Sequence, residues 1–275
     1  MSGKKQHIQF RILNKHLIIL FSFLFLIVIA SCKEKNKSSL TKNKEQTHWT
    51  YDGETSPEHW AEIEKNSDCD GKSQSPINII VDHTTPVNNV DDLKIFYTPQ
   101  TVISKVKNNG HSIQFDFEPG DSIRYKKEIY HLKQIHFHEP AEHIINGIRY
   151  PIEIHFVHKS DTNNLTVLSI FGEEGEISSL FNFFETFLPI KNGESKIIDQ
   201  KVDLTSLYPK STGFYSYSGS LTTPPCTENV NWVIFKDQLI LSYTQALLLK
   251  ANMPLNNYRN EQPLHDRVVQ YHYEN

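Results

Sequence analysis

The sequence predicts a mainly β (α+β) fold, in which a large twisted, mostly antiparallel central sheet carries a few peripheral helices within a single domain. Short segments rich in β-branched and aromatic residues recur between residues 102 and 171. Asn, Gly, Pro or Asp bounds each segment, as expected for strands that turns connect. Helical periodicity is confined to two stretches, which indicates that the sheet is the framework.

The expected strands are residues 102–106, 112–117, 129–137, 152–157 and 165–171. The expected helices are residues 177–188 and 242–251. In the second helix Tyr243, Ala246, Leu247 and Lys250 recur at the three- and four-residue spacing of one helix face. Residues 48–275 contain no low-complexity break and no internal repeat, so we expect them to form one domain.

Residues 1–31 have the features of a lipoprotein-type signal peptide. They carry four cations and no acidic residue, followed by an apolar run over residues 17–30. This run is shorter than the roughly 20 residues that a membrane-spanning helix needs. Ile29-Ala-Ser31 before Cys32 resembles a bacterial lipobox. We therefore expect Cys32 to carry lipid and to anchor an exported protein at a membrane, facing the periplasm or cell surface. The alternative is an ordinary cleaved signal peptide with an incidental Cys32.

Residues 32–47 contain five lysines and no aromatic residue, which predicts a flexible tether. Lysines beside a membrane anchor are typical of segments that stay solvated or face anionic lipid. Without the four signal-peptide cations, 24 basic residues remain against 32 acidic ones, a formal charge of −8. Such an acidic protein is not expected to bind nucleic acid.

Two cysteines remain in the domain once Cys32 is assigned to lipid. Cys69 and Cys226 form an even pair in an exported chain, which predicts a disulfide. Two free buried thiols are the alternative.

Residues 136–140 read His-Phe-His-Glu-Pro and raise the possibility of a metal site. Side chains alternate along a strand, so His136, His138 and Gln134 share one face. A single pair of this kind is more often an exposed polar feature. Residues 147–149 can form a turn, after which Glu153 and His155 share a face of the next antiparallel strand.

Three imidazoles from two paired strands leave the fourth tetrahedral position open, as a catalytic zinc site requires. A ligating imidazole usually donates its second N–H to a carboxylate or carbonyl. Gln134 and Glu153 are therefore expected to orient His136 and His155.

Six motifs extend this pattern and occur in one order along the chain: Ser73-Gln-Ser-Pro-Ile-Asn78, Asn108-Asn-Gly-His-Ser112, Gln134-Ile-His-Phe-His138, Ala141-Glu-His143, Glu153-Ile-His155 and Gly219-Ser-Leu-Thr-Thr-Pro-Pro225. Together they resemble the α-class carbonic anhydrases, and the resemblance runs from residue 49 almost to the C-terminus. Cys69 and Cys226 also match the disulfide positions of extracellular and bacterial members.

The resemblance implies that His136, His138 and His155 hold Zn²⁺ and that the enzyme hydrates carbon dioxide reversibly to bicarbonate and a proton. In carbonic anhydrase, the standard example of this effect, zinc lowers the pKa of water to about 7 and so supplies hydroxide. The resemblance further implies that Glu142 and Thr222 orient the attacking oxygen and that His111 shuttles the proton.

Further positions match the family's substrate pocket, which takes carbon dioxide or bicarbonate: Val157, Val167, Leu221, Thr223, Val230 and Trp232. Tyr51, Asn109 and Gln114 match residues along the proton path. Without the resemblance, the apolar residues would be assigned to the core. His143 is expected to be packed and hydrogen-bonded, and His83, His131 and His158 are expected at the surface.

Two other interpretations remain open. A metal-binding cupin would use Glu142 as a further ligand and would favour iron or manganese, although the glycines expected of a cupin are missing or misplaced. A carbonic-anhydrase-like domain can also act as a binding module without catalysis. The sequence does not indicate an oligomeric state.

Overall fold

A computed structural model describes residues 48–89, 92–207 and 213–273. The predicted signal peptide, the tether and Cys32 lie outside these residues. Within the described ranges, no helix combines the length and the apolar character that crossing a bilayer requires.

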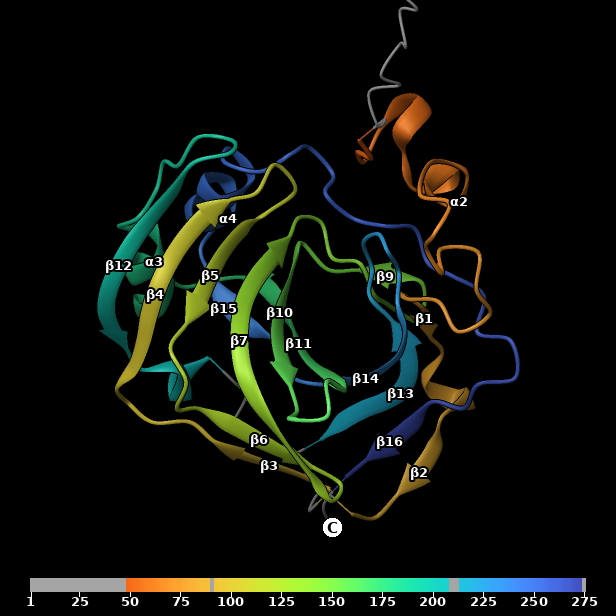
Figure 1. The fold of residues 1–275 in the computed structure, drawn as a ribbon. Coiled ribbons are helices and arrows are strands. Elements are labelled where there is room, and N and C mark those ends of the chain that lie inside the picture. Colours follow the sequence, from red (N-terminus) through yellow and green to blue (C-terminus); the bar gives the residue numbers. More distant parts are fainter. Residues whose placement is uncertain (1–47, 90–91, 208–212, 274–275) are drawn as a thin grey trace, which may run out of the picture. The chain divides into compact units, whose positions relative to one another are not determined.

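The framework is a large curved sheet, which Figure 1 shows as a continuous series of arrows. In chain order its strands are β2 (Thr85–Val87), β3 (Leu93–Phe96), β4 (Thr101–Asn108), β5 (Ile113–Phe117), β6 (Ser122–Tyr125), β7 (Glu128–His138), β10 (Ile152–Lys159), β11 (Leu165–Glu174), β12 (Ser195–Val202), β13 (Phe214–Ser220), β14 (Glu228–Phe235), β15 (Leu239–Leu241) and β16 (Gln270–His272). The main path through the sheet is β12-β4-β5-β7-β10-β11-β14-β13-β16-β2. The mainly β prediction is confirmed, and each of the five expected strands overlaps a strand of this sheet.

Most strand pairs in the large sheet are antiparallel, as predicted. The exceptions are β11 with β14, β11 with β15, and β16 with β2, which run parallel. A smaller sheet is formed by β1 (Asn78–Ile79), β8 (Ile144–Ile145) and β9 (Ile148–Arg149). The central sheet is therefore mixed, with a local antiparallel core at β5, β7, β10 and β11.

Helices are short and lie outside the sheet. They are η1 (Gly53–Thr55), η2 (Pro57–His59), α2 (Trp60–Ile63), η3 (Val81–His83), α3 (Ser179–Glu185), η4 (Leu204–Ser206) and α4 (Tyr243–Lys250). α3 and α4 lie together beside β4, β5 and β12 (Figure 1). Ser242 begins α4 with a reciprocal capping box to Gln245, and the Gln245 side chain also bonds Ser178, which caps α3. Both predicted helices exist, with tighter bounds.

The two faces of the central strands have different surroundings. Along β7, Ile135 and Phe137 enter the larger apolar cluster, which also receives Ile154 from β10. The alternate positions point the other way, so His136 and His155 lie on the opposite face with the second cluster. The alternation of side chains along each strand thus places the larger apolar cluster on one face and the histidines on the other.

A disulfide joins Cys69 to Cys226, as predicted, with a Cα–Cα distance of 4.9 Å. Next to it, the buried Arg259 guanidinium donates to the backbone carbonyls of Cys69 and Ser75 and to the side chain of Gln74. These bonds tie the loop after α2 to the segment after α4, and the disulfide ties the same loop to the one that follows β13.

The prediction that His158 lies at the surface is wrong. Its side chain is fully buried, and Nδ1 donates to the carbonyl of Phe156 while Nε2 lies 2.6 Å from the Tyr97 hydroxyl. The tyrosine comes from 61 residues earlier in the chain, so the local sequence gave no sign of this pocket. His83 is exposed and His131 partly so.

Candidate metal centre

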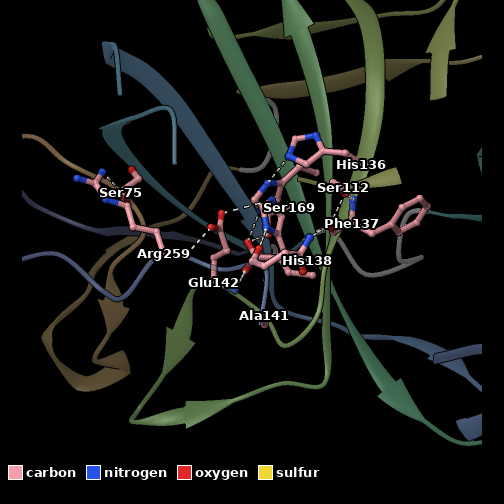
Figure 2. A network of polar contacts seen from close by, with 12 residues as sticks. Ser75, Ser112, His136, Phe137, His138, Ala141, Glu142, Ser169 and Arg259 are labelled. Carbon is pink, nitrogen blue, oxygen red and sulfur yellow. Dashed lines mark hydrogen bonds and ion pairs between the residues drawn. The ribbon is translucent and has the colours of Figure 1, made fainter. Parts of the chain in front are cut away.

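Three histidines meet where β7 and β10 pair. The antiparallel register sets His155 opposite His136 and Glu153 opposite His138. One ring nitrogen from each histidine lies within 4.8 Å of the others, and His155 Nδ1 is 3.2 Å from His136 Nε2. Figure 2 shows His136 and His138 as members of this polar network. The structure therefore brings the three sequence-predicted ligands together.

Gln134 contacts Nδ1 of His136, the ring nitrogen that does not face His155. Its Oε1 lies 2.9 Å from His136 Nδ1, two residues along the same strand face. If Nδ1 donates to this oxygen, a neutral ring keeps a lone pair on Nε2. Nε2 is the nitrogen that faces His155.

Glu153 orients His155 through a 2.7 Å contact between Oε1 and Nε2, which leaves Nδ1 on the ligand side. The same Oε1 accepts from His143 and Ser169, and Oε2 accepts from the backbone amides of Glu142 and His143. Burial alone would raise the pKa of Glu153. The two histidines and their hydrogen bonds outweigh burial and hold it well below the ordinary value.

The hydrogen bonds continue outward from Glu153 in one direction. An ionised carboxylate only accepts, so His143 donates from Nδ1 and a neutral His143 ring accepts at Nε2. The Tyr217 hydroxyl, 2.7 Å away, then donates to Nε2, and Ser75 Oγ donates to Tyr217. Ser75 in turn accepts from the amide of Ser220. The expectation that His143 is packed and hydrogen-bonded is confirmed.

Asn257 orients His138 and was missed from the sequence. Its backbone carbonyl lies 2.6 Å from His138 Nδ1, while its side chain donates to the carbonyls of His111 and Phe137. Any residue type can supply a backbone carbonyl, so the sequence carries no signal for this contact. His138 Nε2 is buried and has no hydrogen-bond partner among the described residues.

The donor set fits a zinc ion. Burial lowers the pKa of His138 to about 4 and also lowers the pKa of His136 and of His155. All three rings are therefore neutral at pH 7 and can act as ligands. Each also has a partner on its second nitrogen, and the buried, unpaired Nε2 of His138 is an orphaned atom that a metal would satisfy.

Glu142 is fully buried beside the histidines. Its Oε1 accepts from the Arg259 amide, and its Oε2 lies 3.5 Å from His138 Nε2. Oε2 has no hydrogen bond of ordinary geometry to any described residue. The neighbouring Thr222 hydroxyl is near enough to lower the pKa of the Glu142 carboxyl. Burial raises the pKa of Glu142 to about 7, and Thr222 opposes this increase.

An apolar wall borders the metal centre. Val167, Val230 and Trp232 are buried in the second cluster, against which Val157 and Leu221 pack. The Trp232 ring centroid lies 4.9 Å from that of His155. The sequence-predicted pocket residues thus share one face of the sheet with the ligands, and Thr223 is half-buried in the adjoining loop.

His111 lies on the loop between β4 and β5. Asn109 Oδ1 accepts from the amides of His111 and Ser112, while Asn109 Nδ2 donates weakly to Gln114. Gln114 pairs with His136 across β5 and β7, so the loop and the ligand strand are adjacent. Tyr51 packs edge-on against His111, and burial, followed by the charge of Glu142, raises its pKa.

The fold and the site define a class: a β-sheet protein with three converging histidines that could hold a metal ion. The family model of eukaryotic-type carbonic anhydrases matches residues 55–273. A carbonic anhydrase of Neisseria gonorrhoeae is 38% identical over 226 residues, covering 81% of this chain and 87% of that protein. Dioscorin DB3L of Dioscorea polystachya is 31% identical and covers 92% and 93% of the two chains.

A solved structure supports the same family assignment. The α-carbonic anhydrase of Thermovibrio ammonificans, in complex with the inhibitor sulfanilamide, has a TM-score of 0.77 and 35% identity, and covers 81% of this chain and 98% of that one. The chain belongs to the α-class carbonic anhydrase family and is an enzyme of the carbonic anhydrase type. The cupin interpretation is thereby excluded.

Proposed function

We propose that the protein catalyses the zinc-dependent, reversible hydration of carbon dioxide to bicarbonate and a proton. One observation carries this proposal. Three neutral imidazoles converge beside an apolar wall, each oriented through its second nitrogen, and one of them presents a buried Nε2 with no partner among the described residues. Family membership supplies the reaction, and this geometry supports its chemistry.

His136 Nε2, His138 Nε2 and His155 Nδ1 are the atoms that would hold the ion. Zinc, when bound, makes water acidic enough to supply a hydroxide nucleophile near neutral pH. The role of the protein is to keep the three rings neutral and to fix their tautomers. Gln134, the Asn257 carbonyl and Glu153 do this through one hydrogen bond each.

Thr222 and Glu142 would orient the attack. A threonine hydroxyl that donates its single proton to Glu142 can only accept from another group. The attacking oxygen would therefore donate its own proton to Thr222 and turn a lone pair toward the substrate carbon. Burial holds the Glu142 carboxyl in place, with the Arg259 amide on its other oxygen.

Carbon dioxide has no net charge or dipole, so the apolar wall of Val157, Val167, Leu221, Val230 and Trp232 is its natural binding surface. Thr223, next to Thr222 in the adjoining loop, would border the same pocket. The polar ligands lie on the same sheet face, so substrate and nucleophile would meet there.

His111 would carry the proton away, along a path lined by Tyr51, Asn109 and Gln114. In the described conformation, burial and then the charge of His48 lower the pKa of His111 to about 4. A ring with this pKa cannot store a proton at pH 7. The shuttle therefore needs either to leave this position or to pass the proton on at once.

The test is a stopped-flow assay of carbon dioxide hydration on the mature protein, before and after treatment with a zinc chelator. We expect activity that the chelator removes, that added zinc restores and that sulfanilamide inhibits. His111→Ala should slow turnover in weak buffer without reducing zinc content, and added imidazole should recover part of the rate. Activity that survives complete metal removal would contradict the proposal, and a zinc-loaded protein without activity would favour a binding module.

Lipid anchoring at Cys32 remains part of the proposal. The disulfide is consistent with an exported protein. Mass spectrometry of the mature N-terminus should show an acylated Cys32, and an unmodified start elsewhere would contradict the anchor.

A further inference from the structure

Asp116 is a carboxylate on β5 that has a different partner on each oxygen. Its Oδ1 accepts from Nε2 of Gln114, two residues back on the same strand face, at 2.5 Å. Its Oδ2 accepts from Nζ of Lys107, on the neighbouring strand β4, at 3.1 Å. The side chains of Asp116 and Lys107 are both partly buried. The carboxylate is therefore held between a cation and a side-chain amide.

The pairing of β5 with β7 places Asp116 on the sheet face of the metal centre. Gln114 lies opposite His136, and Asp116 lies opposite Gln134, which contacts His136. Directly opposed side chains on paired strands point to the same face and lie roughly 5 Å apart. Asp116 is thus one strand away from the histidine cluster and next to the residues proposed to line the proton path.

The bond to Asp116 fixes which end of the Gln114 amide faces the path. A carboxylate in an ion pair only accepts, so Gln114 must turn its NH₂ group toward Asp116 and its Oε1 away. Oε1 then lies 3.4 Å from Nδ2 of Asn109. The 2.5 Å bond to a charged acceptor is much stronger than this long contact between two neutral amides. Asp116 therefore decides the orientation of Gln114.

Asn109 extends this chain of hydrogen bonds to the loop that carries the proposed shuttle. Its Oδ1 accepts from the backbone amides of His111 and Ser112, at 2.9 and 2.8 Å. Its Nδ2 must therefore face Gln114, and it donates to Oε1 there. Every donor in the chain points away from the loop, so Asp116 is the acceptor at which the chain ends.

We propose that Asp116 is a positioning residue for proton transfer. This inference rests on the proposed function, in which Gln114 lies on the path to His111. Asp116 holds the NH₂ group of Gln114 and leaves its Oε1 as an acceptor for water on that path. An NH₂ group in the same place would donate to the water and reverse its orientation.

The ion pair makes Asp116→Asn a sharp test, because the change keeps the shape of the side chain and removes its charge. The Lys107 ammonium can only donate, so it takes the single oxygen of the new amide. The new NH₂ group then faces Gln114, which must turn its own oxygen toward it. We therefore expect Asp116→Asn to invert the Gln114 amide, so that its NH₂ group faces the proton path.

The kinetic test compares Asp116→Asn with wild type in zinc-loaded protein. Glu118→Gln is the matched control, because it removes a carboxylate charge from an exposed residue two positions further along the chain. In weak buffer we expect Asp116→Asn to lower kcat about 3-fold or more, a small part of the ~10²-fold that positioned proton transfer contributes. kcat/KM and zinc content should not change, and imidazole buffer should restore kcat. A kcat equal to that of wild type and of Glu118→Gln would overturn the proposal.

A double variant separates this role from a merely structural one. In Asp116→Asn combined with Lys107→Met, no ammonium competes for the new amide oxygen, which can turn back to Gln114. The kcat in weak buffer should therefore recover toward the wild-type value. Structural damage from the two changes would instead accumulate. A double variant as slow as Asp116→Asn, or slower, would overturn the proposal.

NMR of the side-chain amides tests the orientation without catalysis, with and without zinc. In Asp116→Asn the nuclear Overhauser effect between the amide protons of Gln114 and Asn109 should become stronger, because the NH₂ group of Gln114 turns toward Nδ2 of Asn109. An unchanged effect would overturn the proposal. A wild type without hydration activity would overturn the proposed function and this inference together, whereas an inverted Gln114 with a wild-type kcat would overturn this inference alone.

Discussion

At the scale of single residues, the polar groups around the histidines form one directed network rather than a set of separate pairs. Starting from the ionised Glu153, each donor fixes the next one outward through His143, Tyr217 and Ser75. The orientation of His155 therefore depends on residues outside the three-histidine cluster.

This dependence can be tested with Tyr217→Phe. The change leaves His143 Nε2 buried without its donor, which should lower the free energy of unfolding by about 1–3 kcal/mol. Urea unfolding measures the loss, and a chelator competition assay should show weaker zinc binding. Tyr215→Phe, a buried tyrosine on the same strand, is the control. Equal effects of the two changes would show that the Tyr217 hydroxyl has no special role.

The buried His158 predicts a pH effect on stability. Burial lowers its pKa to about 3, whereas an unfolded histidine protonates near ~6.5. Below pH ~6.5 the unfolded chain binds the extra proton, so stability is complete above that pH and falls as the pH decreases toward 3. Between pH 7 and pH 5 the loss from this residue is on the order of 1–2 kcal/mol.

His158→Gln removes the titrating group. Its free energy of unfolding, measured in urea at pH 7 and pH 5, should therefore change less between the two values than that of wild type. An equal change in both proteins would mean that another group causes the acid sensitivity.

The sequence indicated which side chains hydrogen-bond to the site residues, but not which backbone groups do so. Gln134 and Glu153 were predictable because two-residue alternation places them beside His136 and His155. The Asn257 carbonyl and the Arg259 amide were not predictable, because every residue has these groups. Only the fold brings this carbonyl to His138 and this amide to Glu142.

At the scale of elements, the pairing of β7 with β10 creates the site, since a shift of one residue would turn the ligands to the core face. Five strands, β4, β5, β7, β10 and β11, were predictable from their β-branched and aromatic composition. The strands from β12 onward were not predicted from the sequence. β12 has largely exposed side chains, and β13 is buried on both faces although serine alternates with tyrosine along it.

The disulfide connects the loop after α2 to the loop that follows β13. It closes a loop with a sequence separation of 157 residues, which in the chain-entropy model stabilises the fold by about 5 kcal/mol. Cys226 also donates its amide to Thr223, next to Thr222. We expect the double change Cys69→Ser and Cys226→Ser to lower the urea midpoint strongly and kcat more than zinc content. Under reducing conditions wild type should lose the same stability; an unchanged midpoint would contradict this role.

At the scale of the whole molecule, a bound ion should stabilise the fold. A ligand that binds only the native state adds about 4 kcal/mol at a concentration 1,000 times its Kd. Chelation should therefore lower the thermal midpoint, and stoichiometric zinc should restore it, whereas magnesium should not because imidazole ligands suit zinc. A midpoint that chelation leaves unchanged would argue against a tightly held metal.

The order of strands in the sheet is also a whole-molecule property. β11 pairs with β14, which follows it by more than fifty residues and runs parallel to it. Local composition cannot specify such a pairing, because it depends on which apolar faces meet after the chain has turned. The sequence therefore predicted the strands and the sheet, but not this pairing.

Glu153 has a consequence for anyone who wishes to modify this enzyme. The same carboxylate that aligns His155 also accepts from the amide of Glu142, so both sides of the catalytic centre share one anchor. On the proposed mechanism, substitutions at Glu153 should alter zinc affinity and the orientation of Glu142 together. Gln134 contacts His136 instead, so a change there should alter zinc affinity by itself.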